Sequence, residues 1–513
     1  MRPKKTSLGA GCGKSRRGFL KGSVGLVAGG AAAQLMPGCV AAPQSSAALL
    51  NSLQNLDGRA ILLKDGIIMS MDRQVGDFDR ADLLIQGKKI VSVGPNLQAP
   101  GNALVVNAER MVVMPGFVDT HHHQYETVLR SVLANGMILT AAPRGPKNNY
   151  GSVIQGIFTP LYTPDDARIA EVVSSLSQIS AGVTTTIDTS QVQLTPEHTD
   201  ACIAGLKESG RRAVFAYGAN GQNAAEKFPV EIARLRKQYF SSDDQLLTLA
   251  ANLTLNRDQF KIARSLGAPI VSHFWGPAAR GNPNFELFAK EGLLGPDNEY
   301  IHFTQQPESR WKIVADTGGR ISIATPIEMQ MRHGHPPFQE CLDRGIRPSL
   351  SVDVECNMTA DSFTQMRCAF TWQRAMINER SIQGEENLPP LVTCRDVIEF
   401  ATVNGARDAH LDSKIGTLTP GKEADIIMLA TNRVNVYPLN NVPGAIVTLM
   451  DTTNVENVFI AGKVMKWQGQ LVSVDLDRIG RQIETACDAL LARAKYPRDL
   501  WGTCCPGPDV PLL

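Results

Sequence analysis

Short apolar runs alternate with longer segments of helical periodicity along most of this chain. Runs rich in β-branched and aromatic residues, such as "GVTTTIDTS" and "RRAVFAYGAN", follow segments such as "PDDARIAEVVSSLSQISA", whose apolar residues recur at helical spacing. Parallel strands need a long crossover connection, and a helix of this length supplies one. The alternation therefore predicts a (β/α)8 TIM-like barrel. A doubly wound open sheet is the alternative, but no G-x-G-x-x-G phosphate loop follows a first strand.

Two further groups of short strands lie outside this repeating region. One is predicted from "AILLKDGIIMSMD" and "ADLLIQGKKIVSVGP" near the N-terminus, and the other from "IGTLTPGKEADIIMLA" and "VENVFIAGKVMKWQGQLV" near the C-terminus. A closed barrel brings its two ends together, so these distant segments can meet in one domain. We therefore predict a small β-sandwich domain built from N- and C-terminal segments.

The same pattern divides the chain into consecutive regions. The C-terminal region has apolar residues at helical spacing, which we expect to pack against the protein: Leu476, Ile479, Ile483, Cys487 and Leu490. The predicted regions are an export segment at 1–42, a linker at 43–58, the N-terminal half of the sandwich at 59–114, the barrel at 115–413, the C-terminal half of the sandwich at 414–474, and a C-terminal helix and tail at 475–513.

The N-terminus has the pattern of a bacterial export signal. "SRRGFLKG" precedes the weakly hydrophobic run "SVGLVAGGAAAQL", which matches signals read by the twin-arginine export machinery. We therefore expect a periplasmic or extracellular protein. "LMPGC", ending at Cys39, leaves lipid anchoring at that cysteine as an alternative, but Met36 and Pro37 suit a lipobox poorly, and plain cleavage before about Ser45 is favoured.

The amino-acid composition argues against some classes of binding partner. The chain has 51 basic and 50 acidic residues and a formal net charge of +1, so it offers no excess of positive charge for nucleic acid or an anionic membrane. Its ten cysteines are scattered without a C-x-x-C pair, which argues against a zinc ribbon or a thioredoxin-like site. A small-molecule substrate is the expected partner, and a homo-oligomer stays open.

Three consecutive histidines follow the apolar run in "MPGFVDTHHHQYETVLRS". Side chains alternate across a strand, so His121 and His123 point to one side and His122 to the other. Active sites of parallel barrels lie at the C-terminal strand ends, where further metal-capable side chains are found at His273, His302 and Asp353. Nitrogen and oxygen ligands without thiolate suit zinc, iron(II), cobalt or manganese. A solvated, histidine-rich loop is the alternative.

Together these motifs resemble a known family. "PGFVDTHHH", the single histidines on later strands, "SVDV" and "IGTLTPGKEADIIML" are similar to the amidohydrolase superfamily, on the branch of cytosine, guanine and S-adenosylhomocysteine deaminases and triazine hydrolases. The match runs from about Ala60 to Val472. The resemblance implies one divalent metal, with zinc favoured over iron or manganese, because "LLTLAANLTL" has no lysine for a two-metal carbamate bridge. The implied metal ligands are His121, His123, His273 and Asp353.

The resemblance also implies catalytic roles. Asp353 would pass a proton from the attacking water to the leaving nitrogen, and His302 would orient or polarise the substrate. Deaminases of this branch carry a glutamate three residues after the fifth-strand histidine, where this chain has Gly276 in "HFWGP". The candidates for substrate contact near the strand ends are Glu328, Glu355 and Trp275, and for both glutamates a solvated or salt-bridged surface carboxylate is an equal alternative.

The predicted function is hydrolysis of a carbon–nitrogen bond other than a peptide bond. The substrate class would be a small cyclic or aryl amide, amidine or amine, attacked by metal-activated water. One alternative is hydrolysis of another activated bond, in a carbamate, a lactone or a carbon–halogen compound, because the same water attacks any activated carbon. The other is a non-catalytic, exported barrel that binds a metal or ligand.

Overall fold

A computed structural model of the chain describes residues 46–138, 149–276 and 284–501. The predicted twin-arginine segment and Cys39 lie outside these residues. Among the described residues, no helix combines the length and the apolar character needed to cross a membrane.

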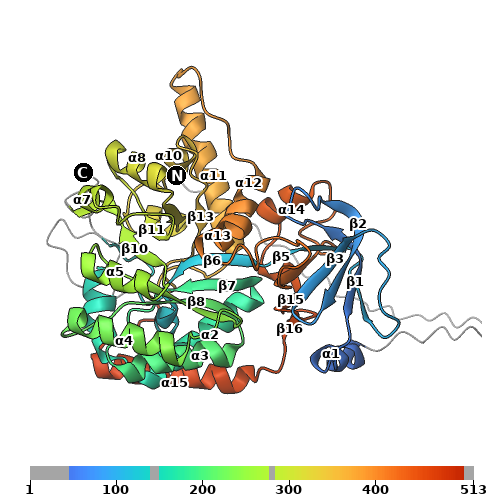
Figure 1. Cartoon of the computed structure of the whole chain (residues 1–513), viewed down its shortest axis with the longest axis horizontal. Helices are drawn as coiled ribbons and strands as arrows, with labels where there is room; N and C mark the ends of the chain where they lie inside the picture. The colour runs from blue at the N-terminus through green and yellow to red at the C-terminus, as the bar shows by residue number, and fades with distance from the viewer. Residues whose placement is uncertain (1–45, 139–148, 277–283, 502–513) are drawn as a thin grey trace, which may run out of the picture. The chain divides into compact units, whose positions relative to one another are not determined.

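Parallel strands in chain order form the sheet of the barrel, and each lies beside the next (Figure 1). The predicted (β/α)8 TIM-like barrel is thereby confirmed in its topology. The strands are β6 (Phe117–His122), β7 (Val183–Asp188), β8 (Arg212–Tyr217), β9 (Leu247–Asn252), β10 (Ile270–Phe274), β11 (Asn298–His302), β12 (Arg320–Ile323) and β13 (Ser349–Leu350).

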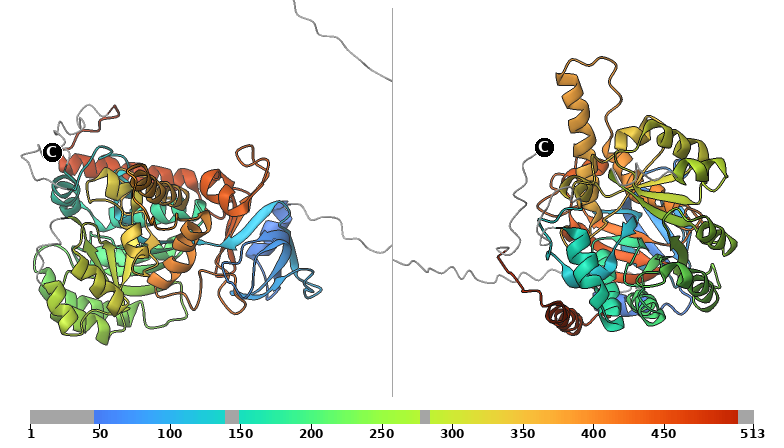
Figure 2. Two further views of the ribbon diagram at one scale, coloured as in Figure 1. Left: turned by 90° about the horizontal axis from the view of Figure 1, so that it is seen from above. Right: turned by 90° about the vertical axis from the view of Figure 1, so that its left-hand side faces the viewer.

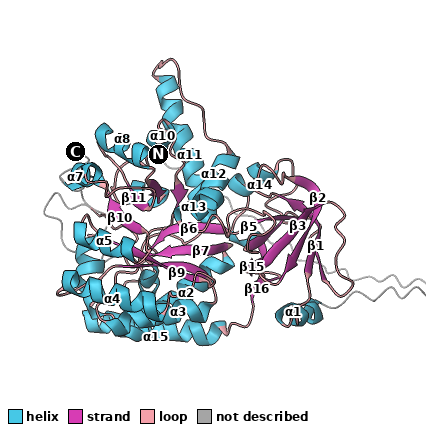
Figure 3. Ribbon diagram, in the orientation of Figure 1, coloured by secondary structure: helices cyan, strands magenta, loops and turns pink. Residues whose placement is uncertain are grey.

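Helices connect these strands and cover the outside of the barrel (Figure 3). Local sequence sets their ends: Thr163 and Asp166 form a capping box before the first of them, and Gly210 ends the second in a left-handed conformation. The helices that follow the strands are α2 (Pro164–Ser180), α3 (Pro196–Ser209), α4 (Ala224–Gln238), α5 (Arg257–Ser265), α7 (Asn284–Lys290), α8 (Glu308–Thr317), α9 (Thr325–Gln330), α10 (Phe338–Leu342), α11 (Ser362–Ile382), α12 (Cys394–Glu399) and α13 (Gly405–Asp408).

The barrel closes between its first strand and the segment that follows the very short β13. The backbone N–H of His123 donates to the carbonyl of Asp353 at 2.7 Å, and the N–H of Asp353 donates to the carbonyl of His121 at 2.9 Å. Inside the barrel, the Thr120 hydroxyl lies 2.7 Å from that of Ser322 and 2.8 Å from that of Ser349. First and last strands are therefore joined at the level of the three histidines.

The sheet of the small domain combines strands from both ends of the described chain, as Figure 2 shows. The predicted small β domain built from N- and C-terminal segments is confirmed, and its strands form one mixed sheet whose two ends contribute to a single apolar cluster. N- and C-terminal segments meet where β5 and β14 pair antiparallel. The strands are β1 (Ile61–Ile68), β2 (Phe78–Gln86), β3 (Lys89–Gly94), β4 (Leu104–Asn107), β5 (Met111–Pro115), β14 (Ile426–Ala430), β15 (Val455–Ile460), β16 (Lys463–Trp467) and β17 (Gln470–Leu471).

The remaining helices lie at the two ends of the described chain and beside the sheet of the small domain. They are α1 (Ser46–Gln54), α14 (Val442–Thr448) and α15 (Leu476–Ala494), and α15 contacts α2 on the outside of the barrel. Ile479 and Leu490 of α15 are buried, as the apolar spacing predicts. Leu476 is 55% exposed, because it is the first residue of the helix and lies beyond the packed stripe.

A buried ion pair joins the barrel to the sheet of the small domain. Arg212, the first residue of β8, donates from Nε to Asp425 at 2.8 Å and from Nη2 to Asp425 at 2.9 Å and to Glu423 at 2.6 Å. Its side chain is 1% exposed, and both carboxylates lie in the "GKEAD" stretch just before β14. A planar guanidinium matches two carboxylates at fixed positions, so this contact holds the two sheets in one relative arrangement.

We predict that Arg212→Met lowers the free energy of unfolding by about 3–5 kcal/mol, because it removes the buried cation of Asp425 and leaves Glu423 with only the longer contacts to Lys88 and Lys89. Urea unfolding followed by circular dichroism measures the change. The control is Arg257→Met, which removes a half-exposed partner of Glu291 and should cost about 1 kcal/mol or less. Equal losses in both variants would contradict the role given to Arg212.

Candidate active site

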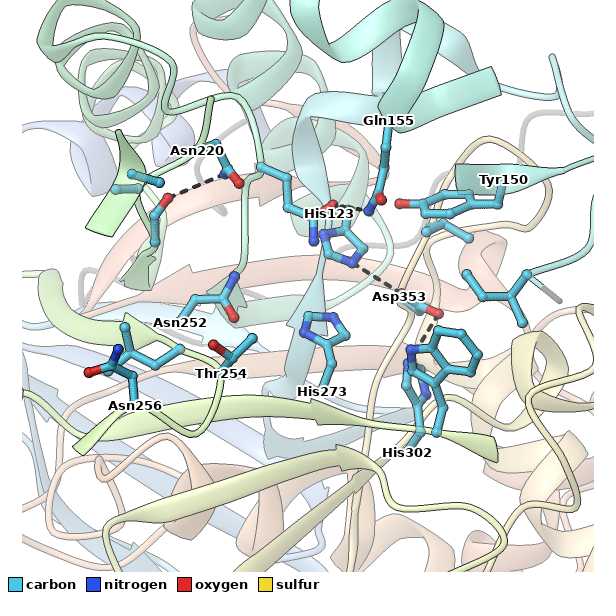
Figure 4. A pocket seen from close by; sticks show the side chains of 18 of the residues that line it. His123, Tyr150, Gln155, Asn220, Asn252, Thr254, Asn256, His273, His302 and Asp353 are labelled. Atoms are coloured by element: carbon cyan, nitrogen blue, oxygen red, sulfur yellow. Dashed lines mark hydrogen bonds and ion pairs between the residues drawn. The ribbon is translucent and has the colours of Figure 1, made fainter. Parts of the chain in front are cut away.

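Four histidines and one aspartate from different strand ends converge at the mouth of the barrel (Figure 4). Nε2 of His121 lies 3.1 Å from Oδ1 of Asp353, and Nε2 of His123 lies 3.4 Å from the same oxygen. The ring of His273 lies 4.7 Å from that of His121 between centroids, and Nε2 of His302 lies 3.7 Å from Oδ2 of Asp353. The structure thus brings together all five residues that the strand-end rule selected.

Hydrogen bonds from Thr189 determine which nitrogens of the first two histidines face the centre. Nδ1 of His123 lies 2.8 Å from the Thr189 carbonyl, which only accepts, so that nitrogen carries the proton. The Thr189 hydroxyl donates to the His122 carbonyl at 3.1 Å and therefore accepts from Nδ1 of His121 at 2.7 Å. Both Nε2 atoms consequently point lone pairs toward Asp353.

The centre is suited to a divalent cation. Burial, reinforced by the neighbouring imidazoles, holds the pKa of His121 and of His123 well below the ordinary value, and burial lowers the pKa of His273 to about 4. Nε2 of His273 is buried without a hydrogen-bond partner in the described chain. Neutral imidazole lone pairs that converge beside a carboxylate repel one another unless a cation lies between them, and three histidines with one carboxylate are ligands of catalytic divalent metals.

Two residues of the centre have unusual backbone conformations. His302, at the end of β11, has φ of 68°, and Asp353, after β13, has φ of 70°. Non-glycine residues in the left-handed region cost about 1–3 kcal/mol each and persist where the surrounding structure determines them. For Asp353 that determinant is the pair of backbone hydrogen bonds to β6, so the closure of the barrel also sets the direction of its carboxylate.

His302 has a carboxylate on each side. Its Nδ1 lies 3.1 Å from Oε1 of Glu328, and its ring stacks on that of His333 with 4.5 Å between centroids. Burial favours the neutral ring, but the charges of Asp353 and Glu328 together raise the pKa of His302 above its ordinary value. An imidazole held in this way can donate a hydrogen bond where negative charge develops.

Both glutamates expected to contact the substrate lie elsewhere. Glu328 is fully buried on α9 and bonds to His302 and to the backbone N–H of Ala324, so it orients a histidine. Glu355 lies on the far side of the metal-ligand strand, where it contacts His122 at 3.2 Å and also Arg130. Glu355 follows Asp353 by two residues, which on a strand would place both side chains on the same face. The strand ends at Leu350, so this reasoning placed Glu355 on the wrong side.

His122, the middle one of the three consecutive histidines, lies in a separate, buried cluster of charged side chains. His122 lies 3.3 Å from Asp119 and 3.2 Å from Glu355, and all three side chains are buried. Burial opposes the charged ring, but the two facing carboxylates raise the pKa of His122 to about 10. The alternation of β6 therefore separates neutral imidazoles on one face from an imidazolium on the other.

A cavity of about 540 Å³ opens above the centre. Trp275 lines it, as expected, together with the amides Asn220, Asn252 and Asn256, which Figure 4 places across the cavity from Tyr150. Among the described lining residues there is no lysine or arginine, and the only carboxylate is that of Asp353. Asn252 ends β9, so a strand-end search that included amides would have found it; Tyr150 has no comparable sequence signal.

Comparisons with known proteins agree with this geometry. The model of the amidohydrolase family matches residues 290–465. A 5'-deoxyadenosine deaminase of Methanosarcina mazei is 23% identical over 453 residues, which are 84% of this chain and 99% of that protein. A 5-methylthioadenosine/S-adenosylhomocysteine deaminase of Desulfitobacterium hafniense is 23% identical over 445 residues, 82% of this chain and 97% of its own length.

Solved structures share the fold. An adenosine deaminase from Xanthomonas campestris with bound zinc has a TM-score of 0.72 at 18% identity and covers 84% of this chain and 98% of its own. An atrazine chlorohydrolase from Arthrobacter aurescens, complexed with zinc, has a TM-score of 0.73 at 19% identity and covers 83% of this chain and 100% of its own.

We predict that Thr189→Val lowers the affinity for a divalent metal about 10- to 100-fold, because His121 loses the acceptor that orients its ring. Competition with a chromogenic chelator measures the affinity. Thr185→Val is the matched control, since Thr185 is buried on β7 and its hydroxyl has no partner in the described chain. An unchanged affinity in Thr189→Val would show that His121 needs no such support.

Proposed function

We propose that this chain is a member of the amidohydrolase family and that, with one zinc ion, it hydrolyses the bond between a ring carbon and an exocyclic amino group in an uncharged nitrogen heterocycle. The observation that carries the proposal is the position of Asp353, which faces the three histidines and also lines the cavity. One carboxylate can therefore contact both the attacking water and the leaving group.

Each residue of the centre has its own role in the proposed reaction. A divalent metal held by His121, His123, His273 and Asp353 supplies, when bound, water with a pKa lowered from about 15.7 to about 7. Asp353 takes a proton from the attacking water and delivers it to the leaving nitrogen. His302 lies beside Asp353 and donates a hydrogen bond to the ring nitrogen or oxygen on which negative charge develops.

The lining of the cavity supports an uncharged substrate. Its described polar groups away from the centre are mainly amides and hydroxyls, such as those of Asn220, Asn252, Thr254 and Asn256. Amides pair with neutral donors and acceptors, whereas a carboxylate or phosphate calls for arginine or lysine. Among the relatives, the 5'-deoxyadenosine deaminases act on a substrate whose name fits this description. We propose an aminopurine with a neutral sugar or similar polar substituent.

Hydrolysis of a carbon–halogen bond is a second candidate. Gly276 stands where the resemblance places a proton-shuttling glutamate, and the described lining has no carboxylate besides Asp353. A halide ion leaves without taking up a proton, so its departure needs no second proton donor. The similarity in fold to an atrazine chlorohydrolase is compatible with this candidate.

We predict that the zinc-loaded chain releases ammonia from aminopurine nucleosides faster than from aryl amides or cyclic ureas. An enzyme-coupled ammonia assay over such a panel measures the rates, with bound zinc determined by atomic absorption. Asp353→Asn should lower the rate by about 10²- to 10⁴-fold. The exposed Asp343→Asn is the control and should retain full activity.

Release of chloride from chlorinated heterocycles without release of ammonia from their amino counterparts would favour the second candidate. Activity that survives in Asp353→Asn would contradict the assigned proton path.

We also propose export by the twin-arginine route to the periplasm or the exterior. The support is the "SRRGFLKG" pattern alone. Replacing Arg16 and Arg17 together by lysine should retain the protein in the cytoplasm, as measured by fractionation of expressing bacteria. Replacing Lys4 and Lys5 by arginine is the control and should leave export unchanged. Equal export of both variants would contradict the proposal.

A further inference from the structure

Tyr150 is the tyrosine among the described residues that line the cavity, and binding of the metal does not involve it. Its side chain is 4% exposed, and Figure 4 shows its hydroxyl pointing into the cavity above Asp353. The backbone N–H of Tyr150 donates to the carbonyl of Met137 at 2.9 Å, and the helical segment η3 (Gly151–Phe158) begins at the next residue. This hydrogen bond and the start of the helical segment fix the backbone of Tyr150 and so the position of its ring.

The Tyr150 hydroxyl is oriented by a buried carboxyl group. It donates to Oε1 of Glu126 at 2.5 Å, and Glu126 is fully buried on η1 (Gln124–Leu129), the turn that follows the metal-ligand strand. A buried carboxyl group without a hydrogen-bond donor is costly, so this contact keeps the phenolic hydrogen directed at Glu126. The oxygen then presents lone pairs, and not its hydrogen, to the cavity.

Tyr150 and Asp353 line the same end of the cavity. Asn220, Asn252 and Asn256 lie at the opposite end (Figure 4). If Asp353 protonates the leaving nitrogen, as in the proposed function on which this step rests, that nitrogen must lie at the end where Tyr150 is found. The groups at that end include a proton donor, Asp353, and a hydrogen-bond acceptor, the Tyr150 oxygen.

We propose that Tyr150 is a catalytic residue that accepts an N–H hydrogen bond from the leaving amino group and so turns the nitrogen lone pair toward Asp353. Asp353 transfers to that lone pair the proton it took from the attacking water. The C–N bond breaks with its electron pair on nitrogen, ammonia leaves, and the ring carbon keeps the oxygen of the water. Tyr150 gains and loses no proton. Glu126 is a positioning residue that acts through Tyr150.

The test compares two leaving groups on one ring. Tyr150→Phe keeps the ring and removes the oxygen, and kcat/KM is measured for an aminopurine nucleoside and for the 6-chloro compound with the same sugar. Chloride has no N–H, so the variant should lose about tenfold or more on the amino compound and less than about threefold on the chloro compound. Bound zinc per chain, measured by atomic absorption, should equal that of the parent.

Tyr162→Phe is the matched control. Tyr162 is buried, its hydroxyl donates to the carbonyl of Tyr125 at 3.0 Å, and it is absent from the described lining of the cavity. This variant should change both rates by the same small factor. It therefore reports what the loss of one buried hydroxyl does to the enzyme as a whole.

The outcomes separate this inference from the proposed function. A parent enzyme that deaminates, with equal losses on both substrates or none in Tyr150→Phe, overturns the role of Tyr150 and leaves the deaminase assignment standing. A parent enzyme that releases chloride but no ammonia overturns both. A selective loss on the amino compound, with zinc content unchanged, supports the hydrogen bond to the leaving group.

Discussion

The site depends on the pairing that closes the barrel between β6 and Asp353. Two backbone hydrogen bonds join residues 121–123 to Asp353, and they connect the first strand of the barrel to the last. The same pairing holds Asp353 in a left-handed conformation that a free chain would leave. Without closure, the carboxylate would lose both its position beside the histidines and its place in the cavity wall.

Buried charge on the other side of β6 supports this closure. His122, Asp119 and Glu355 form a paired cluster in which each charge depends on the others, since an unpaired buried ion is strongly destabilising. Asp119 also accepts the backbone N–H of Val352 at 3.0 Å, so one carboxylate binds both strands of the closing pair. Arg212 has the corresponding role between the barrel and the sheet of the small domain.

The cavity separates two kinds of interaction. Imidazole nitrogens, Asp353 and Tyr150 surround the end where a bond would break, and the amides of Asn220, Asn252 and Asn256 line the other end (Figure 4). Electrostatic groups are most effective where charge changes during the reaction, whereas amides recognise a region of the substrate that does not change. In the proposed reaction, Asp353 and Tyr150 control the leaving nitrogen, although Gly276 stands where the resemblance places a glutamate.

The sequence alone determined the barrel topology and the strand ends. Alternation along β6 predicted that His121 and His123 share one face, and the strand-end rule selected His273, His302 and Asp353, because both follow from backbone geometry that repeats. Tertiary structure decided the rest. Glu328 and Glu355 lie outside the described cavity lining, where they contact His302 and His122, whereas Tyr150 enters the cavity. The direction of a side chain on a turn or loop is set by partners distant in sequence, such as Arg130, Glu126 and Met137, whose proximity no local periodicity encodes.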